Sequence, residues 1–197
     1  MTDMVRPGGR TARVRTAVLR AAGDVLAEQG FAHLDLADLA RRAEVGKTTV
    51  YRRWGTVAAL VADLLVDMAA ESLPRTDLGT LEDDLLANAR LVVRTLTDGR
   101  QGRLFRAVIA AATTDERTAA ALHGFYETRV GEWAPCVAAA VERGEVPAGT
   151  DSHEVIRAVS APLYYRMLTS ALPLDEDAAA RSARAAATAA RAGVFVR

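Results

Sequence analysis

The sequence contains a single cysteine, Cys136, and a single lysine, Lys47, among its 197 residues. One cysteine cannot form a disulfide within the chain, which favours a reducing compartment. No apolar run approaches the roughly 18 residues that a membrane-spanning helix requires, and no signal-peptide pattern is present. These absences predict a cytoplasmic protein that does not cross a membrane.

Motifs for catalysis and metal binding are also missing. The chain has no Gly-x-Ser-x-Gly elbow, no glycine-rich phosphate loop and no His/Cys set with metal-ligand spacing. The three histidines, His33, His123 and His153, are dispersed along the chain. The acidic run 82–84 falls in the first turn of a predicted helix, where acids complement the helix dipole, so a structural role is favoured over a metal site. We therefore expect no catalytic residue, no metal and no cofactor.

Charge is balanced overall but divided unevenly along the chain. Residues 1–56 hold ten basic and six acidic residues, a net charge of +4, and residues 57–197 hold fifteen and nineteen, a net charge of −4. A positive head joined to a negative body fits a small DNA-binding unit attached to a part that avoids DNA. This predicts a DNA-binding domain over 1–56 and a second domain over 57–197.

Apolar residues recur with helical spacing along the chain, and no segment alternates as a β-strand does. The pattern predicts an all-α fold of about nine helices, near residues 11–29, 36–43, 47–54, 57–73, 80–97, 104–112, 115–143, 151–172 and 175–192. Asp35, Thr56, Thr80 and Asp151 are the expected N-caps. The basic first ten residues predict either an arm that lies along DNA or a frayed terminus.

The stretch 36–55 is the most informative part of the sequence. Leu36, Leu39, Ala40 and Ala43 fall on one helix face, a tight turn follows at 44–46, and a second helix opens at Lys47. Its inward positions are Val50 and Trp54. Its outward positions, which we predict to bind DNA, are Lys47, Thr48, Thr49, Tyr51, Arg52 and Arg53.

This outward face carries hydroxyls, a phenol and cationic groups, and no acid. Such groups donate to phosphates, pair with guanine edges and contact thymine methyls in a major groove. We expect Lys47 and Arg52 to contact phosphate or guanine. Thr48, Thr49 and Tyr51 are expected to read bases or fix the register.

Residues 46–54, Gly-Lys-Thr-Thr-Val-Tyr-Arg-Arg-Trp, after a helix that contains Ala40, resemble the helix-turn-helix of TetR-type bacterial repressors. The resemblance extends back to 17–22 and 28–31 and forward to 59–61, about fifty residues in all. It implies a three-helix helix-turn-helix head, a C-terminal helical bundle and sequence-specific regulation of transcription. A repressor is the usual member, and the residues leave an activator open.

Two positions depart from the family pattern. Glu44 stands in the turn where members usually carry glycine, and a non-glycine residue with positive φ costs roughly 1–2 kcal/mol. Either the turn is strained or its geometry differs. Val57 stands where members often carry a lysine that touches a phosphate, so that contact is expected to be lost or replaced.

The resemblance also implies a C2 homodimer formed by the last two long helices. Residues 161–166, Ala-Pro-Leu-Tyr-Tyr-Arg, resemble the segment that many members have there. The small residues of the last helix suggest packing against a broad partner, and the alternative is that this helix only completes the core of its own chain. A dimer would place two heads on palindromic double-stranded DNA, whose turns repeat at roughly 34–36 Å.

The family's body holds a cavity between its fourth and eighth helices, where a small molecule releases the DNA. The candidate effector contacts in this sequence are Phe105, Ile109, His123, Tyr126, Trp133 and Met167. Their apolar character favours a small hydrophobic effector, although each residue also suits an ordinary core. The alternative is a body that responds to a protein partner.

Overall fold

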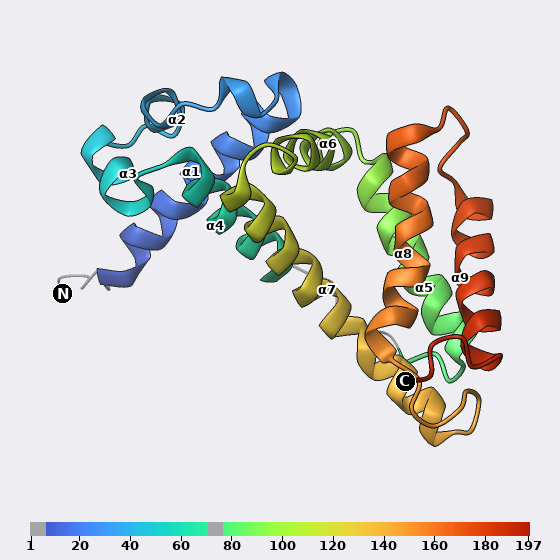
Figure 1. The fold of residues 1–197 in the computed structure, drawn as a ribbon. Helices are drawn as coiled ribbons and strands as arrows, with labels where there is room; N and C mark the ends of the chain where they lie inside the picture. The colour runs from blue at the N-terminus through green and yellow to red at the C-terminus, as the bar shows by residue number, and fades with distance from the viewer. Residues whose placement is uncertain (1–6, 71–76) are drawn as a thin grey trace. The chain divides into compact units, whose positions relative to one another are not determined.

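A computed structural model of the chain describes residues 7–70 and 77–197, which Figure 1 traces. The described residues form nine α-helices and no strand, which confirms the all-α prediction. The helices are α1 Pro7–Gln29, α2 Leu36–Arg42, α3 Lys47–Trp54, α4 Val57–Ala70, α5 Leu81–Thr97, α6 Gln101–Ala112, α7 Glu116–Glu142, α8 Ser152–Thr169 and α9 Glu176–Arg191. A 3-10 turn, η1, spans Phe31–His33 between α1 and α2. None of these helices combines the length and apolar character that crossing a bilayer demands.

The helix starts follow from side chains that accept hydrogen bonds from exposed backbone N–H groups. The Asp35 carboxylate accepts from the N–H of Asp38 at 2.8 Å, and the Thr80 hydroxyl accepts from the N–H of Asp83 at 3.2 Å. Asp151 caps α8 in the same way, and Thr56 accepts from the N–H of Ala59 at 3.2 Å. The four predicted caps are therefore confirmed.

Several helix boundaries differ from the predictions. Helix α1 begins at Pro7, so the expected arm of ten residues loses its last four to the helix, and proline suits a first helical position. Helix α6 begins at Gln101 and not at Leu104, because the Asp98 carboxylate accepts from the N–H of Gln101 at 2.7 Å and opens the helix early. Residues 1–6 of the arm and 71–73 of the expected fourth helix lie outside the described residues.

The chain divides into two compact units, and it passes from one to the other within α6, between Gly102 and Arg103, and within α7, between Phe125 and Tyr126. The first unit holds α1 to α4, α6 from Arg103 onward and the beginning of α7. The second holds α5, the rest of α7, α8 and α9. The first unit therefore extends beyond residue 56, and a functional boundary between 56 and 57 stays a prediction.

In the first unit, α1 packs on α2 and α4, and α3 packs on both α2 and α4. The centre of this packing is fully buried, with Val18 of α1, Ala40 of α2, Val50 of α3 and Leu60 of α4 at 0% exposure. Ala40 and Val50 lie at the positions where the helical pattern of the sequence placed an apolar face. The unit therefore has its own core, which holds the two short helices α2 and α3 in place.

In the second unit, α5, α8 and α9 lie side by side (Figure 1). The alanine face of α9 is buried against α5 and α8 of the same chain, and Ala179, Ala187 and Ala190 are inaccessible to solvent. The Ser182 hydroxyl adds a hydrogen bond to the carbonyl oxygen of Val159 at 2.5 Å. Close approach to α5 and α8 thus accounts for these buried alanines, and contact of α8 and α9 with a second subunit stays a prediction.

The junction between α5 and α6 requires a glycine. A Cβ atom added to Gly102 would lie 2.2 Å from the carbonyl oxygen of Leu96, far inside van der Waals contact. The backbone N–H of Gly102 donates to the carbonyl oxygen of Asp98 at 3.0 Å. Gly102, which belongs to the second unit with α5, is thus packed directly on the end of α5, at a distance that a larger residue could not adopt.

Candidate nucleic-acid interface

The turn between α2 and α3 has the hydrogen bonds of a Schellman motif. The N–H of Val45 donates to the carbonyl oxygen of Ala40 at 2.9 Å, and the N–H of Glu44 donates to that of Arg41 at 3.1 Å. This pattern requires a left-handed residue at the second position after the helix, and Glu44 has φ of 54°. The turn therefore keeps the usual geometry with a glutamate where glycine is preferred. Of the two expectations, a strained turn and a turn of different geometry, the structure matches the strained turn.

Helix α2 is braced on its outer side by one carboxylate. Asp38 accepts hydrogen bonds from Arg42 at 2.6 Å and from Arg41. These two bonds, with Arg42 contributing more, lower the pKa of the Asp38 carboxyl below its usual range. Asp38 thus contributes at both ends of α2: its backbone N–H donates to the N-cap Asp35, and its carboxylate accepts from the arginines of the last turn.

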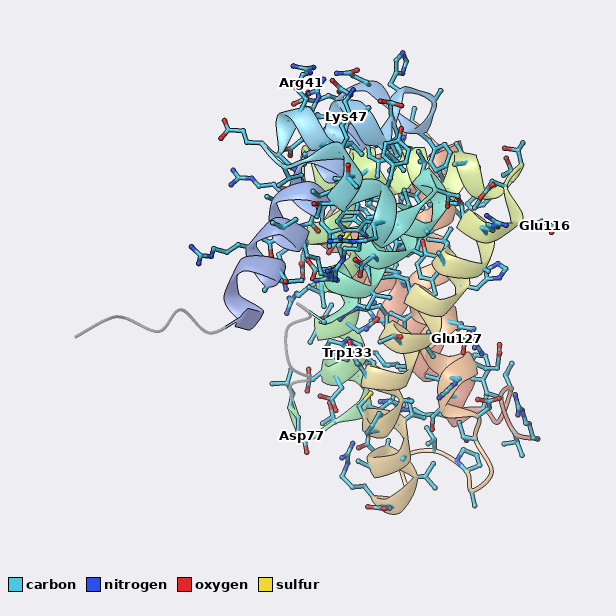
Figure 2. The ribbon with its side chains drawn as sticks, turned by 90° about the vertical axis from the view of Figure 1, so that its left-hand side faces the viewer. Arg41, Lys47, Asp77, Glu116, Glu127 and Trp133 are labelled. Carbon is cyan, nitrogen blue, oxygen red and sulfur yellow. The ribbon has the colours of Figure 1, made fainter. Side chains whose placement is uncertain are left out.

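Helix α3 is eight residues long and buries Val50 and Trp54. The six side chains predicted to bind DNA all lie on this helix. Lys47, Thr48, Tyr51, Arg52 and Arg53 are exposed and Thr49 is half-buried. Figure 2 shows Lys47 of α3 and Arg41 of α2 directed outward at the surface of the first unit. The inward and outward positions thus agree with the sequence, and DNA contact by these side chains stays a prediction.

A groove of about 690 Å³ runs beside this helix. Thr11 and Val14 of α1 line one side, and Thr49 and Arg52 of α3 line the other. Glu44 lies in its wall and also borders a second groove of about 650 Å³ along α1. The strained turn therefore contributes Glu44 to the walls of both grooves.

Behind the helix, a polar cluster joins α3 to α1 and α4. The indole Nε1 of Trp54 donates to the Asp63 carboxylate at 3.0 Å, and Arg15 donates to the same carboxylate through Nε at 3.1 Å and Nη2 at 2.8 Å. Arg15 also donates to Asp67. Burial raises the pKa of Asp63, but the hydrogen bonds from Arg15 and Trp54 outweigh it and hold the pKa below the usual range. Asp63 therefore stays charged at neutral pH.

No sequence motif pointed to this cluster. Arg15 follows a basic N-terminal stretch in the sequence, and in the structure it lies within α1 and pairs with two acids of α4. No motif or period relates residues 15, 54 and 63. Only the position of Trp54, inward on a short helix, signalled that its indole N–H would need a buried acceptor.

The six candidate effector contacts are distributed over both units. In the first unit, Phe105 is buried with its ring centroid 5.4 Å from that of Phe125, Ile109 is half-buried and His123 is exposed. In the second unit, Trp133 and Met167 are buried and Tyr126 is half-buried. These environments are compatible with core packing as well as with ligand contact, so the assignment stays a prediction.

Tyr126 makes an edge-to-face contact with Tyr164 in the second unit, with centroids 5.3 Å apart. Burial is the main cause that raises the pKa of Tyr164 to about 12, and it raises that of Tyr126 as well. Both phenols are therefore neutral at physiological pH. Among residues 7–70 and 77–197, no three His, Cys, Asp or Glu side chains gather as a metal site would require.

Comparison with known proteins adds to this geometry. A sequence model for bacterial regulatory proteins of the tetR family matches residues 18–64, and one for a Tetracyclin repressor-like C-terminal domain matches residues 75–186. The HTH-type transcriptional regulator YdeS of Bacillus subtilis (strain 168), itself uncharacterized, is 31% identical over 153 residues, which cover 77% of each chain. The HTH-type transcriptional regulator AqdR of Rhodococcus erythropolis is 30% identical over 160 residues, covering 79% of this chain and 77% of AqdR.

A solved structure extends the likeness to the whole fold. The crystal structure of the TetR family transcription regulator SCO0332 superposes with a TM-score of 0.72 at 29% identity. The superposition covers 89% of this chain and 97% of that chain. The likeness therefore includes the helices outside the head.

Proposed function

The chain belongs to the TetR family of bacterial regulatory proteins and is a helix-turn-helix transcriptional regulator, and we propose that it is a repressor released from a palindromic operator by a small hydrophobic molecule. The outward face of α3 carries this proposal. It joins Lys47, Arg52 and Arg53 with three hydroxyl-bearing side chains, and it includes no acid. We propose no catalytic role, and the regulator would act in the cytoplasm, where its operator lies.

The DNA contacts follow from the chemistry of each side chain. Lys47 and Arg52 are exposed cations, suited to phosphate oxygens or to the O6 and N7 acceptors of guanine. Thr48, Thr49 and Tyr51 present hydroxyls and methyl or ring surfaces for bases. Arg53 is the sixth contact of the proposal, and it also stacks on Trp54, with its guanidinium carbon 5.3 Å from the ring centroid.

A homodimer is proposed from an exposed apolar stripe at the end of α8. Tyr165, Leu168 and Leu172 are 69%, 46% and 63% exposed, whereas Val159 and Leu163 on the other face of α8 are buried. Tyr165 and Leu168 are three positions apart on α8 and Leu172 follows just after the helix, and exposed large apolar side chains favour association. A second copy covering this stripe would make a symmetric dimer and place two α3 helices on one palindrome.

The effector is proposed to be small and hydrophobic, contacting some of the candidates Phe105, Ile109, His123, Tyr126, Trp133 and Met167. Release requires that the effector bind the conformation with low operator affinity more tightly than the one with high affinity. The alternative is a body that responds to a protein partner. Dissociation of a bound duplex by a small molecule alone, with no second protein present, would favour the effector over that alternative.

The test is a selection of bound duplexes from a random DNA pool at two salt concentrations. A recovered palindrome whose affinity falls steeply with salt is the expected result, because phosphate contacts release counterions. Non-specific binding alone would contradict the proposal. Adding the recovered operator to a reporter gene would then distinguish repression from activation.

A further inference from the structure

The Asp63 carboxylate lies where three helices of the first unit meet. It accepts from Arg15 of α1, from the indole N–H of Trp54 of α3, and it belongs to α4. Arg15 engages both carboxylate oxygens and also donates to the backbone oxygen of Asp63 at 3.3 Å. The guanidinium of Arg15 alone therefore holds the carboxylate in one orientation, and the bond from Trp54 adds to it.

Trp54 is the last residue of α3 and is 7% exposed. A buried indole carries one N–H donor that needs an acceptor, and Asp63 supplies it at 3.0 Å. Because α3 has only two turns and buries only Val50 and Trp54, few contacts determine its orientation. The bond from Trp54 to Asp63 is directional, whereas the hydrophobic burial of Val50 has no preferred direction.

The neighbouring arginine is drawn to the same cluster. The Arg53 guanidinium stacks on the Trp54 ring, and its Nε lies 3.9 Å from the Asp63 carboxylate. One carboxylate thus attracts two consecutive side chains of α3 and one of α1. The end of α3 that carries Arg52 and Arg53 is fixed relative to α1 and α4.

We propose that Asp63 is the positioning residue of the recognition helix: through Trp54 it sets the orientation in which the outward side chains of α3 meet base edges. Asp63 itself does not contact DNA. This inference rests on the proposed function, because it assumes that α3 reads an operator. It adds a residue whose effect is confined to sequence discrimination.

The consequence differs from that of losing a DNA contact. A small rotation of α3 misaligns hydrogen bonds to base edges, which are directional, and leaves attraction to phosphates nearly unchanged. Loss of the Trp54 N–H should therefore weaken the specific complex alone. A purely structural role would lower the fraction of folded protein and weaken every complex equally.

The experiment compares Trp54→Phe with the wild-type protein on the operator recovered by selection and on a scrambled duplex of the same length. Phenylalanine keeps an aromatic ring in the core and removes the N–H donor. We expect the Kd for the operator to rise about tenfold, the equivalent of one charge-assisted hydrogen bond. The Kd for the scrambled duplex should stay within about twofold of wild type, because no phosphate contact changes. For the same reason the salt slope should stay within about 0.3 of the wild-type slope.

Asp67→Asn is the matched control. It removes an acid of the same helix that also pairs with Arg15 and has no bond to Trp54. It should leave the ratio of the two Kd values unchanged. Asp63→Ala should lower the ratio of the scrambled-duplex Kd to the operator Kd, as Trp54→Phe does. The double variant should lose no more discrimination than the more affected single variant, because both substitutions act through one bond.

Three results would overturn the inference: an unchanged ratio in Trp54→Phe, equal weakening of both duplexes, or additive losses in the double variant. Circular dichroism and the unfolding midpoint, measured in the binding buffer, identify a variant that fails to fold, and if Trp54→Phe fails, Asp63→Ala, which removes the acceptor and keeps Trp54, replaces it. A wild-type protein that does not distinguish operator from scrambled duplex would overturn the proposed function together with the inference. A discriminating wild type with an equally discriminating Trp54→Phe would overturn the inference alone.

Discussion

Arg103 donates through Nε to the carbonyl oxygen of Ala27 at 2.8 Å, which joins α6 to the last turn of α1. Carbonyls in the last turn of a helix have no partner within the helix, and Ala27 is buried. Arg103→Met keeps most of the aliphatic stem and removes the donor. We expect its free energy of unfolding in urea to fall by about 1 kcal/mol. Arg106→Met, an exposed arginine on the same helix, is the control, and an equal loss there would contradict this role.

Glu44 offers a test of strain in the turn. Its φ of 54° is unfavourable for any side chain with a Cβ, and glycine would remove a cost of about 1–2 kcal/mol while losing about 0.5–1 kcal/mol to its freer unfolded chain. We expect Glu44→Gly to be more stable than wild type by about 0.5–1 kcal/mol in urea denaturation. Glu44→Gln, which removes the charge and keeps the strain, should show no such gain. Equal stabilities of the two variants would mean that the turn is not strained.

The local features of the head could be predicted because neighbouring residues determine them. Val50 and Trp54 are four positions apart, so a helix must place them on one face, and both are buried. Asp35 precedes Asp38 by three positions, which is the separation at which an N-cap side chain reaches a backbone N–H. Such patterns repeat with the geometry of a single helix and need no knowledge of the fold.

Contacts between distant parts of the chain left no comparable pattern. Arg15 and Asp63 are 48 residues apart, and either could have been an ordinary surface charge. The buried alanine face of α9 illustrates the same limit, because its small residues suit any close partner. In the structure that partner is α5 and α8 of the same chain. Sequence periodicity identifies a face that must be covered but does not identify what covers it.

The proposed roles on α3 predict two different losses of DNA binding. Lys47→Ala removes an exposed cation, so it should weaken binding to all duplexes alike and flatten the salt slope by about 1. Thr49→Ala should instead reduce the preference for the operator over single-base variants of it, with the slope unchanged. Titrations at several salt concentrations distinguish the two. Identical behaviour of the variants would contradict this division of roles.

Glu145 links the loop after α7 to the start of α5 in the second unit. It accepts from the N–H of Leu81 at 2.9 Å and from Arg143 at 2.6 Å. Burial raises the pKa of Glu145, but the hydrogen bonds from the Leu81 N–H and from Arg143 together lower it by more. The pKa of Glu145 therefore lies below its usual range. A carboxyl with a depressed pKa in the folded state stabilises the protein above its unfolded pKa, and this contribution disappears as the pH falls through the folded value.

Glu145→Gln should therefore be less stable than wild type at pH 7, and the difference should shrink as the pH falls below about 4.3, the ordinary pKa of glutamate. Unfolding in urea across this pH range is the measurement. Glu142→Gln, at the exposed last position of α7, controls for the loss of one negative charge. A gap between wild type and Glu145→Gln that stays constant with pH would show that ionisation of this carboxyl is not the cause.

The exposed stripe of Tyr165, Leu168 and Leu172 provides the test of the proposed dimer. Leu168→Glu would place a charge within an apolar contact, and burying it unpaired costs far more than the contact gains. Sedimentation velocity should show the wild type as a dimer and this variant as a monomer, with weaker binding to the palindrome. Val194→Glu adds the same charge at a valine that is 66% exposed in the C-terminal tail and should remain dimeric. If Leu168→Glu stays dimeric while Val194→Glu dissociates, the interface lies on another surface, and the end of α8 would need a different explanation.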